Sequence, residues 1–160
     1  MGSWTDRDGL TIWQSLDIPP VWLLGFLIFT WVGVGWFPGL TIEHAVASGL
    51  GGLLLVAGLV LIAWAALSFR RAGTSIVPHQ VPQRIITTGP FHFTRNPIYL
   101  GDALILSGFI LWQGAWPLLV AIPLFVWLIS RRFIAPEEAR MKENFGSEFA
   151  AFAQKTRRWL

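Results

Sequence analysis

The stretch HQVPQRIITTGPFHFTRNPIYLGD, from His79 to Asp102, decides how the rest of the chain is arranged. It is basic and rich in Pro and Gly, and a strongly apolar block lies on each side of it. A tight turn would join two helices with far fewer residues. Because long loops commonly carry binding and catalytic residues, we expect this stretch to form a functional site.

The end of this stretch carries the signal for a helix start. Asn96 and Pro97 stand where a helix favours a capping side chain and a preset backbone angle. Tyr99 and Asp102 lie three residues apart and so share one face of the first turns. We therefore expect their polar groups to point together at a membrane surface, either in a site or as a capped helix with an interfacial tyrosine.

Composition places the chain among membrane proteins. Of its 160 residues, 54% are hydrophobic and 13% are charged, and ten are tryptophan. This composition predicts a polytopic membrane protein with a single domain over residues 1–160. The chain has no cysteine, which excludes a disulfide framework and thiolate metal sites. His44 beside Glu43 lacks a third ligand, so we expect no metal.

The apolar blocks predict an all-α membrane protein with about four transmembrane helices. The expected spans are 21–37, 45–69, 98–113 and 117–133, after an interfacial N-terminal segment over 1–20. The last two are short and are expected to form a tight helical hairpin, with a re-entrant pair as the alternative. Ala45 with Gly49, and Ser48 with Gly52, predict a close helix contact.

The charges predict how the chain lies across the membrane. All Lys and Arg residues except Arg7 lie between Arg70 and Arg95 or from Arg131 onward. The positive-inside rule then makes the 70–97 loop and the C-terminus cytoplasmic. The tail, 136–160, has apolar residues at helical spacing and predicts a cytoplasmic amphipathic helix bent near Gly146. A bacterial inner membrane or an endoplasmic-reticulum-like membrane suits this topology equally.

Two motifs in this order resemble those of a known family. The first is Gly89-Pro90-Phe91 followed by Arg95-Asn96-Pro97-Ile98-Tyr99-Leu100-Gly101, and the second is Glu137-Glu138, Phe145-Gly146 and Arg157-Arg158-Trp159-Leu160. Together they resemble the integral-membrane methyltransferases that include isoprenylcysteine carboxyl methyltransferase and the phospholipid N-methyltransferases. The resemblance covers roughly the C-terminal half of the chain.

The resemblance implies an enzyme that uses S-adenosylmethionine to methylate a lipidic or small hydrophobic acceptor, such as an isoprenylcysteine carboxylate. A sulfonium cation with an adenine and a ribose suits carboxylates, aromatic faces and backbone groups, which the loop and the tail offer together. The expected cofactor-binding residues are His79, Gly89, Phe91, His92, Asn96, Tyr99, Glu137 and Glu138. The expected catalytic residues are Arg95, Tyr99 and Glu138. Besides the acceptor, we expect membrane lipids as partners and no nucleic acid.

Some positions depart from the family pattern. Asn96 replaces a histidine that is common in the eukaryotic carboxyl methyltransferases, which weakens the case for a prenylated cysteine as acceptor. Phe149 and Phe152 stand where tyrosine is frequent. An arginine lies near the acceptor group in the family, and both Arg95 and Arg132 are eligible here.

Two other functions stay open. The membrane sterol reductases carry a similar Arg-His-Pro-Asn-Tyr-Leu-Gly-Asp run, and Asp102 extends that likeness; such an enzyme would bind a nicotinamide dinucleotide phosphate. The paired acids at 137 and 138 favour the methyl donor, since a 2′-phosphate requires Arg or Lys. The third alternative is a non-catalytic membrane protein with the same fold.

Overall fold

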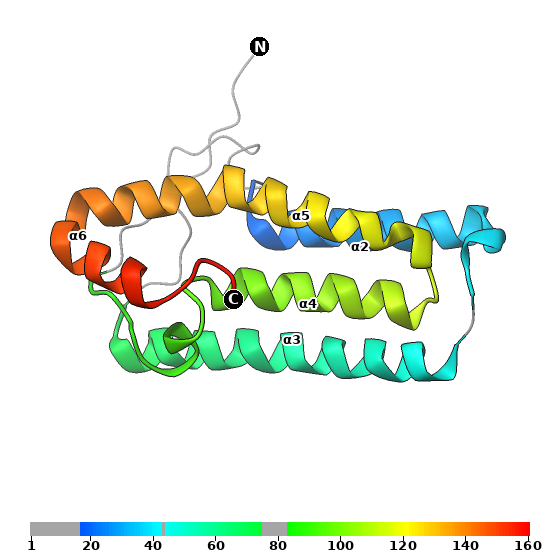
Figure 1. Ribbon diagram of the computed structural model, residues 1–160, viewed down its shortest axis with the longest axis horizontal. Coiled ribbons are helices and arrows are strands. Elements are labelled where there is room, and N and C mark those ends of the chain that lie inside the picture. Colours follow the sequence, from blue (N-terminus) through cyan, green and yellow to red (C-terminus); the bar gives the residue numbers. More distant parts are fainter. Residues whose placement is uncertain (1–16, 43, 75–82) are drawn as a thin grey trace, which may run out of the picture.

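The computed structural model describes residues 17–42, 44–74 and 83–160, and these residues form helices and connecting segments without any strand (Figure 1). The all-α prediction is therefore confirmed. The α-helices are α2 (Pro19–Trp36), α3 (Ala45–Ala72), α4 (Pro97–Trp112), α5 (Ala121–Ile129) and α6 (Ala135–Lys155). Short 3₁₀ segments are η1 (Pro38–Leu40), η2 (Gly89–His92) and η3 (Trp116–Val120), and η4 (Ser130–Ile134) is a π-helical turn.

Consecutive helices from α2 to α5 run in alternating directions along one long axis (Figure 1). Helix α4 packs along α3 on one side and against α2 and α5 on the other. The chain continues without a break from α5 through η4 into α6, which extends past the bundle. The start of α2, the segment before α4, and α6 therefore lie at the same end of the molecule. We call this the loop end.

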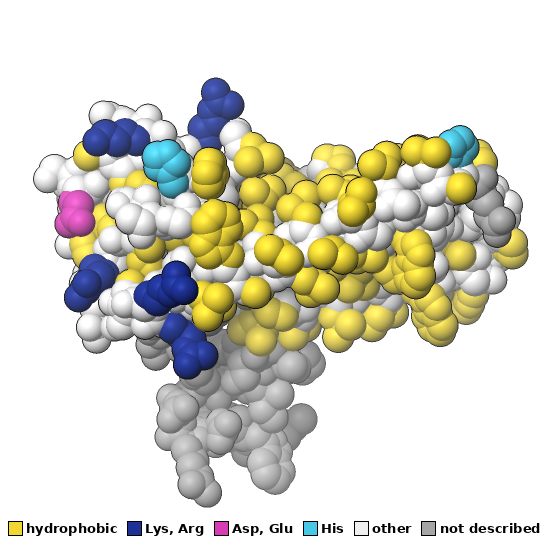
Figure 2. Space-filling model, turned by 90° about the horizontal axis from the view of Figure 1, so that it is seen from below, with side chains coloured by type: hydrophobic (Ala, Val, Ile, Leu, Met, Phe, Trp, Pro, Cys, Tyr) yellow, Lys and Arg dark blue, Asp and Glu magenta, His cyan; other side chains and the backbone are white. Residues whose placement is uncertain are grey.

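Three helical segments are long and apolar enough to cross a membrane. They are Pro19–Trp36, Ala45–Ala72 and the continuous helix Trp116–Lys155, while Pro97–Trp112 is apolar but shorter. Helices α2, α3 and α4 begin and end within three residues of the spans 21–37, 45–69 and 98–113, whereas the helix over the fourth span, 117–133, continues without a break to Lys155. Hydrophobic side chains cover the length of the helices, and Lys and Arg gather at one end (Figure 2). The chain is thus an integral membrane protein, and its sidedness stays a prediction.

The α3–α4 contact uses glycines other than those the sequence suggested. A Cβ on Gly51 would lie 2.7 Å from the carbonyl oxygen of Gly108, and one on Gly58 would lie 2.6 Å from that of Gly101. A Cβ on Gly49 or Gly52 would meet nothing within 4 Å. The predicted contact through Gly49 and Gly52 is therefore wrong for the α3–α4 pair, because a different face of α3, the one that carries Gly51 and Gly58, meets α4.

Helix α6 has the bend that its sequence predicts. Gly146 has φ 49° and ψ −116° inside an otherwise regular helix, a conformation that favours glycine. The bend turns the second half of α6 back toward the segment before α4 (Figure 1). Phe149 and Phe152 are buried there in a cluster with Phe91 and Ala65. The bend therefore brings the two predicted motifs together.

Candidate functional site

The two motifs meet through the backbone of residues 94–96 and of a short segment after α6. We call that segment, residues 156–160, the strap. The Arg95 amide donates to the Arg157 carbonyl at 2.9 Å, and the Thr94 hydroxyl donates to the Arg158 carbonyl at 3.2 Å. The Trp159 indole donates to the Ser130 hydroxyl at 3.1 Å. The strap therefore ties α6 to the start of α4 and to η4.

Arg95 is the most connected side chain of the loop end. One terminal nitrogen, Nη1, donates to the carbonyls of Ala153 at 2.9 Å and Thr156 at 3.0 Å. The other, Nη2, forms an ion pair with Glu138 Oε1 at 2.8 Å. Its Nε is buried and has no hydrogen-bond partner among the described residues. Arg95 therefore holds α6 and the strap in place. Its buried Nε–H group could still donate a hydrogen bond to a ligand.

Glu138 lies between two arginines. Besides Arg95, Arg158 donates to it from Nε at 3.2 Å and from Nη2 in a second, shorter contact. Partial burial raises the pKa of the Glu138 carboxyl, but the hydrogen bonds and charges of Arg158 and Arg95 outweigh this effect and lower the pKa overall. Glu138 is therefore a carboxylate at neutral pH, and its charge is already compensated.

The neighbouring acid, Glu137, has a different partner. The hydroxyl of Tyr99, the single tyrosine of the chain, donates to Glu137 Oε1 at 2.8 Å. The Tyr99 side chain is 7% exposed and its ring lies near that of Phe133, at 6.5 Å between centroids. Tyr99 and Asp102 do not point together at a membrane surface, as the sequence suggested, because both are buried inside the bundle.

Asn96 precedes α4 but does not cap it through its side chain. Its Nδ2 donates to the carbonyl of Arg158 at 2.9 Å, and no side-chain hydrogen bond caps the helix. The capping interpretation is wrong: the hydrogen bond from Nδ2 to the Arg158 carbonyl orients the side-chain amide toward the strap, and its Oδ1 caps no N–H group of α4. Asn96 thus belongs to the same junction as Arg95.

The remaining predicted site residues lie apart from this junction. Gly89 has φ 64°, and an added Cβ would lie 3.0 Å from the Ser68 hydroxyl, so it serves a close approach to α3. Phe91 is buried edge-on against Phe69, at 5.3 Å between ring centroids. His92 is exposed, with its ring against that of Phe93. His79 and Glu43 lie outside the described residues.

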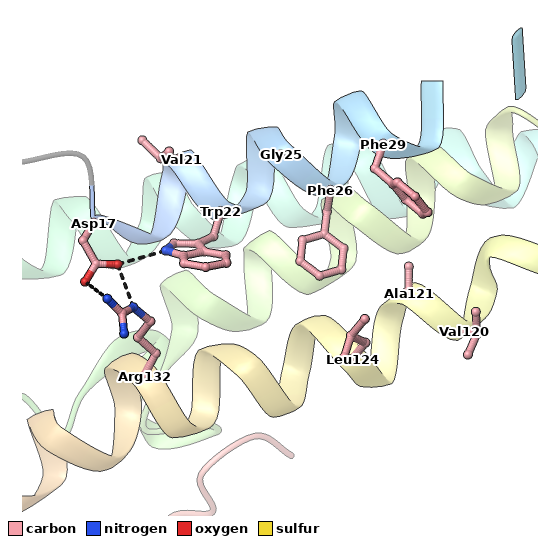
Figure 3. A pocket seen from close by; sticks show the side chains of 10 residues that line it. All are labelled: Asp17, Val21, Trp22, Gly25, Phe26, Phe29, Val120, Ala121, Leu124 and Arg132. Atoms are coloured by element: carbon pink, nitrogen blue, oxygen red, sulfur yellow. Dashed lines mark hydrogen bonds and ion pairs between the residues drawn. The ribbon is translucent and has the colours of Figure 1, made fainter. Parts of the chain in front are cut away.

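Arg132, the alternative arginine for the acceptor, faces α2 instead. Its guanidinium donates two hydrogen bonds to Asp17, at 2.8 and 2.7 Å, and stacks over Trp22 at 5.9 Å from the ring centroid. The ion pair closes one end of an apolar groove of about 740 Å³ between α2 and α5 (Figure 3). The other lining residues are Val21, Gly25, Phe26, Phe29, Val120, Ala121 and Leu124.

Sequence reasoning missed two charged members of these contacts. Arg158 was part of the second motif, but nothing in the motif indicated that it would share Glu138 with Arg95. Asp17 stood in a segment to which the sequence assigned no chemistry. A usable signal exists for Arg158, because an arginine that follows a helix bent by glycine can return toward the acids of the first turn. No local signal pairs Asp17 with Arg132, which is 115 residues away.

Among the described residues, no group of acids and histidines is arranged to hold a metal ion.

Comparison with protein families identifies a match over most of this bundle. The model of a family described as phospholipid methyltransferase matches residues 46–148. The match includes α3, α4, α5 and the first part of α6, and therefore Arg95, Tyr99 and both paired acids. It leaves out α2 and the strap.

Two curated proteins are similar to this chain. An uncharacterized protein of Haemophilus influenzae is 38% identical over 66 residues, which are 39% of this chain and the whole of that protein. Protein-S-isoprenylcysteine O-methyltransferase B of Arabidopsis thaliana is 25% identical over 128 residues, which are 74% of this chain and 61% of the plant protein. The chain therefore spans about three fifths of the plant protein's length. No solved structure matches the chain.

Proposed function

Because this chain belongs to the phospholipid methyltransferase family, we propose that it is a methyltransferase that transfers a methyl group from S-adenosylmethionine to a lipidic acceptor. One observation carries the proposal. The motif before α4 and the acids of α6 lie far apart in the sequence, yet Arg95 contacts Glu138 and Tyr99 contacts Glu137. The residues by which the chain resembles the family thus form one connected cluster at the loop end.

The charged, aromatic and hydrogen-bonding groups of this cluster fit S-adenosylmethionine. S-adenosylmethionine carries a sulfonium, an ammonium and a carboxylate, so its site needs anions and at least one cationic donor. Glu137 and the Tyr99 ring offer an anion and an aromatic face, and the buried Nε of Arg95 offers a donor for a carboxylate. When bound, the donor supplies an electrophilic methyl group, and its carbon–sulfur bond breaks with the electron pair kept on sulfur.

We propose the following roles for the residues of the chain. Arg95, Tyr99 and Glu138 form the catalytic group, in which Arg95 orients an anionic group of the acceptor or the donor. Asn96 and Glu137 complete the cofactor site, together with Glu138. We assign four further residues to the same site through the family motif alone: His79, Gly89, Phe91 and His92. Gly89 and Phe91 pack against α3, and His92 contacts Phe93 at the surface.

We propose that the acceptor reaches this cluster from the bilayer. An isoprenylcysteine carboxylate is the first candidate, because the Arabidopsis protein is named as a methyltransferase for protein S-isoprenylcysteine. A lipidic acceptor explains why a methyltransferase is built from membrane helices, since its apolar part stays in lipid while the reacting group reaches the loop end. We place the loop end on the cytoplasmic face from the distribution of Lys and Arg, and we propose a bacterial inner membrane as the location.

The test is binding of the product analogue to the purified protein. Isothermal titration of detergent-purified protein with S-adenosylhomocysteine should give one site, and Tyr99→Phe and Glu137→Gln should each weaken it. Glu143→Gln is the matched control, because Glu143 is an exposed acid of the same helix. If a reduced nicotinamide dinucleotide phosphate binds and S-adenosylhomocysteine does not, the sterol reductase alternative replaces this proposal.

A further inference from the structure

Asp102 is a buried carboxyl that takes no part in the contacts between the two motifs. Its side chain lies in α4 and is 4% exposed, and its Oδ2 has no hydrogen-bond partner among the described residues. Burying a carboxyl without a partner is costly, and acidic groups inside membrane segments usually mark functional pathways. Ordinary packing does not account for Asp102, which indicates a functional role for this carboxyl.

The position of Asp102 relative to Tyr99 is informative. The two residues share one face of α4, and Asp102 lies one turn farther from the loop end. Helices α2 and α5 carry no titratable residue, and α3 carries only Arg70 and Arg71, at its loop end. Among the residues that the structure describes, the titratable and charged groups near Asp102 are therefore Tyr99 and, around Tyr99, Glu137 and Arg140 of α6. Asp102 lies on the membrane side of the proposed donor site.

We propose that Asp102 is the catalytic base that removes the proton from the methyl acceptor, an inference that rests on the proposed methyltransferase function. An acceptor that arrives through lipid tends to keep its proton, because a low-dielectric environment disfavours a carboxylate or a bare thiolate. A proton must leave before the acceptor atom can attack the methyl group. Asp102 stands on the side from which this acceptor comes.

In the proposed proton transfer, the acceptor's proton passes to a carboxylate oxygen of Asp102, and the electron pair of the broken bond stays on the acceptor atom. That pair forms the new bond to the methyl carbon, while the carbon–sulfur bond of the donor breaks with its electrons kept on sulfur. Asp102 then gives its proton to water as the methylated product leaves.

The other acids of the cluster are poorly suited to this task. Glu138 is held by two arginines, which makes it a weak base. Glu137 already accepts a hydrogen bond from the Tyr99 hydroxyl. Asp102 alone combines a buried position in α4 with a carboxylate oxygen that has no hydrogen-bond partner in the described part of the chain. A base of this kind typically contributes about 10²–10⁴-fold to turnover.

The experiment compares Asp102→Asn with Asp102→Glu in detergent-purified full-length protein. Turnover is measured from labelled S-adenosylmethionine into vesicles that contain phosphatidylethanolamine and N-acetyl-S-farnesylcysteine. Asp102→Asn should lower kcat about 10²–10⁴-fold and leave the affinity for S-adenosylhomocysteine unchanged, while Asp102→Glu should retain part of kcat. The acidic limb of the pH profile should move in Asp102→Glu. Ser107→Ala, farther along the same helix, is the control and should leave kcat unchanged.

A second measurement does not depend on activity. The infrared carbonyl band of a protonated buried carboxyl should titrate in the parent protein and be absent in Asp102→Asn. If Asp102→Asn keeps the parent kcat, or if no such band titrates, Asp102 is not the base. If the parent binds no S-adenosylhomocysteine, the proposed function itself fails and takes this inference with it. If the parent binds it and only the Asp102 results disagree, the inference alone is overturned.

Discussion

Replacing Glu138 with Gln should destabilise the loop end, because this carboxylate neutralises a largely buried arginine. The Arg95 side chain is 14% exposed and that of Glu138 is 18% exposed. Removing one partner of a fully buried ion pair costs about 3–5 kcal/mol. Gln keeps the shape and one acceptor oxygen, and the Arg158 side chain, 41% exposed, contributes at most about 1 kcal/mol after solvent screening. We therefore expect a loss of about 2–4 kcal/mol.

Intrinsic tryptophan fluorescence can measure this loss, because the chain contains ten tryptophans. A loss of 1 kcal/mol lowers Tm by about 2–4 °C in a chain of this size, so Glu138→Gln should melt roughly 5–15 °C below the parent. The matched control is Glu148→Gln, which changes an exposed acid of the same helix and should leave Tm unchanged.

A double-mutant cycle separates the two ion pairs of Glu138. The coupling of Glu138→Gln with Arg95→Gln should be large and insensitive to salt, because both side chains are mostly buried. The coupling with Arg158→Gln should be small and should shrink at high salt. Equal melting temperatures for Glu138→Gln and Glu148→Gln would refute the reasoning, since Arg95 would then not depend on its counterion.

Four further outcomes follow from the structure. Because the pKa of Glu138 is lowered in the folded protein, this carboxylate stabilises the fold above the ordinary carboxyl pKa of about 4.3, and the contribution is lost as the pH falls through the lower folded-state pKa. The difference in Tm between parent and Glu138→Gln should therefore shrink steadily as thermal scans are run at pH values falling below about 4.3. Gly108→Ala places a Cβ 2.6 Å from the Gly51 carbonyl oxygen and should cost about 1–3 kcal/mol, whereas Gly49→Ala, with open space around it, should be neutral in the same scan. Arg95→Lys should reduce turnover beyond its effect on Tm, because Lys cannot reproduce the divergent hydrogen bonds of the guanidinium; parent turnover in a correctly folded Arg95→Lys protein would make this arginine purely structural. Thr74→Cys should be protected from an impermeant thiol reagent added outside intact cells and Gly39→Cys should be labelled, and the reverse pattern would invert the proposed orientation.

The sequence predicted the helices well because their signal is local. Each span is an apolar run, and Gly, Pro and charged residues mark its ends, so the bounds of α2, α3 and α4 could be predicted to within a few residues. The end of the fourth span could not, because its helix continues into the charged tail. The contact face of α3 could not be predicted in the same way. Glycines occur on several faces of that helix, and the choice of Gly51 and Gly58 depends on where Gly101 and Gly108 lie on α4.

The sequence predicted which residues form the cluster at the loop end, but it did not predict which of them contact one another. Arg95, Tyr99 and the paired acids stand in motifs that the chain shares with its family. The sequence alone could not assign Arg95 to Glu138, since several other arginines lie near the acid pair in the sequence. Two of the three hydrogen-bond partners of the Arg95 side chain are backbone carbonyls, those of Ala153 and Thr156, and a carbonyl has no residue-specific signal.

The π-helical turn η4 joins α5 to α6 and has an evolutionary consequence. Such a turn holds about one residue more than the α-helical turn it replaces. Deleting one residue between Ser130 and Ile134 would restore a plain α-helix and leave the helix beyond it on nearly the same face, because the π-helical turn takes up its extra residue locally. Any other change in length that no such turn absorbs would rotate everything beyond it by about 100°, and Glu137 and Glu138 would turn away from Tyr99 and Arg95. Homologous genes should therefore tolerate the loss of this one residue but resist other changes in length between α5 and α6.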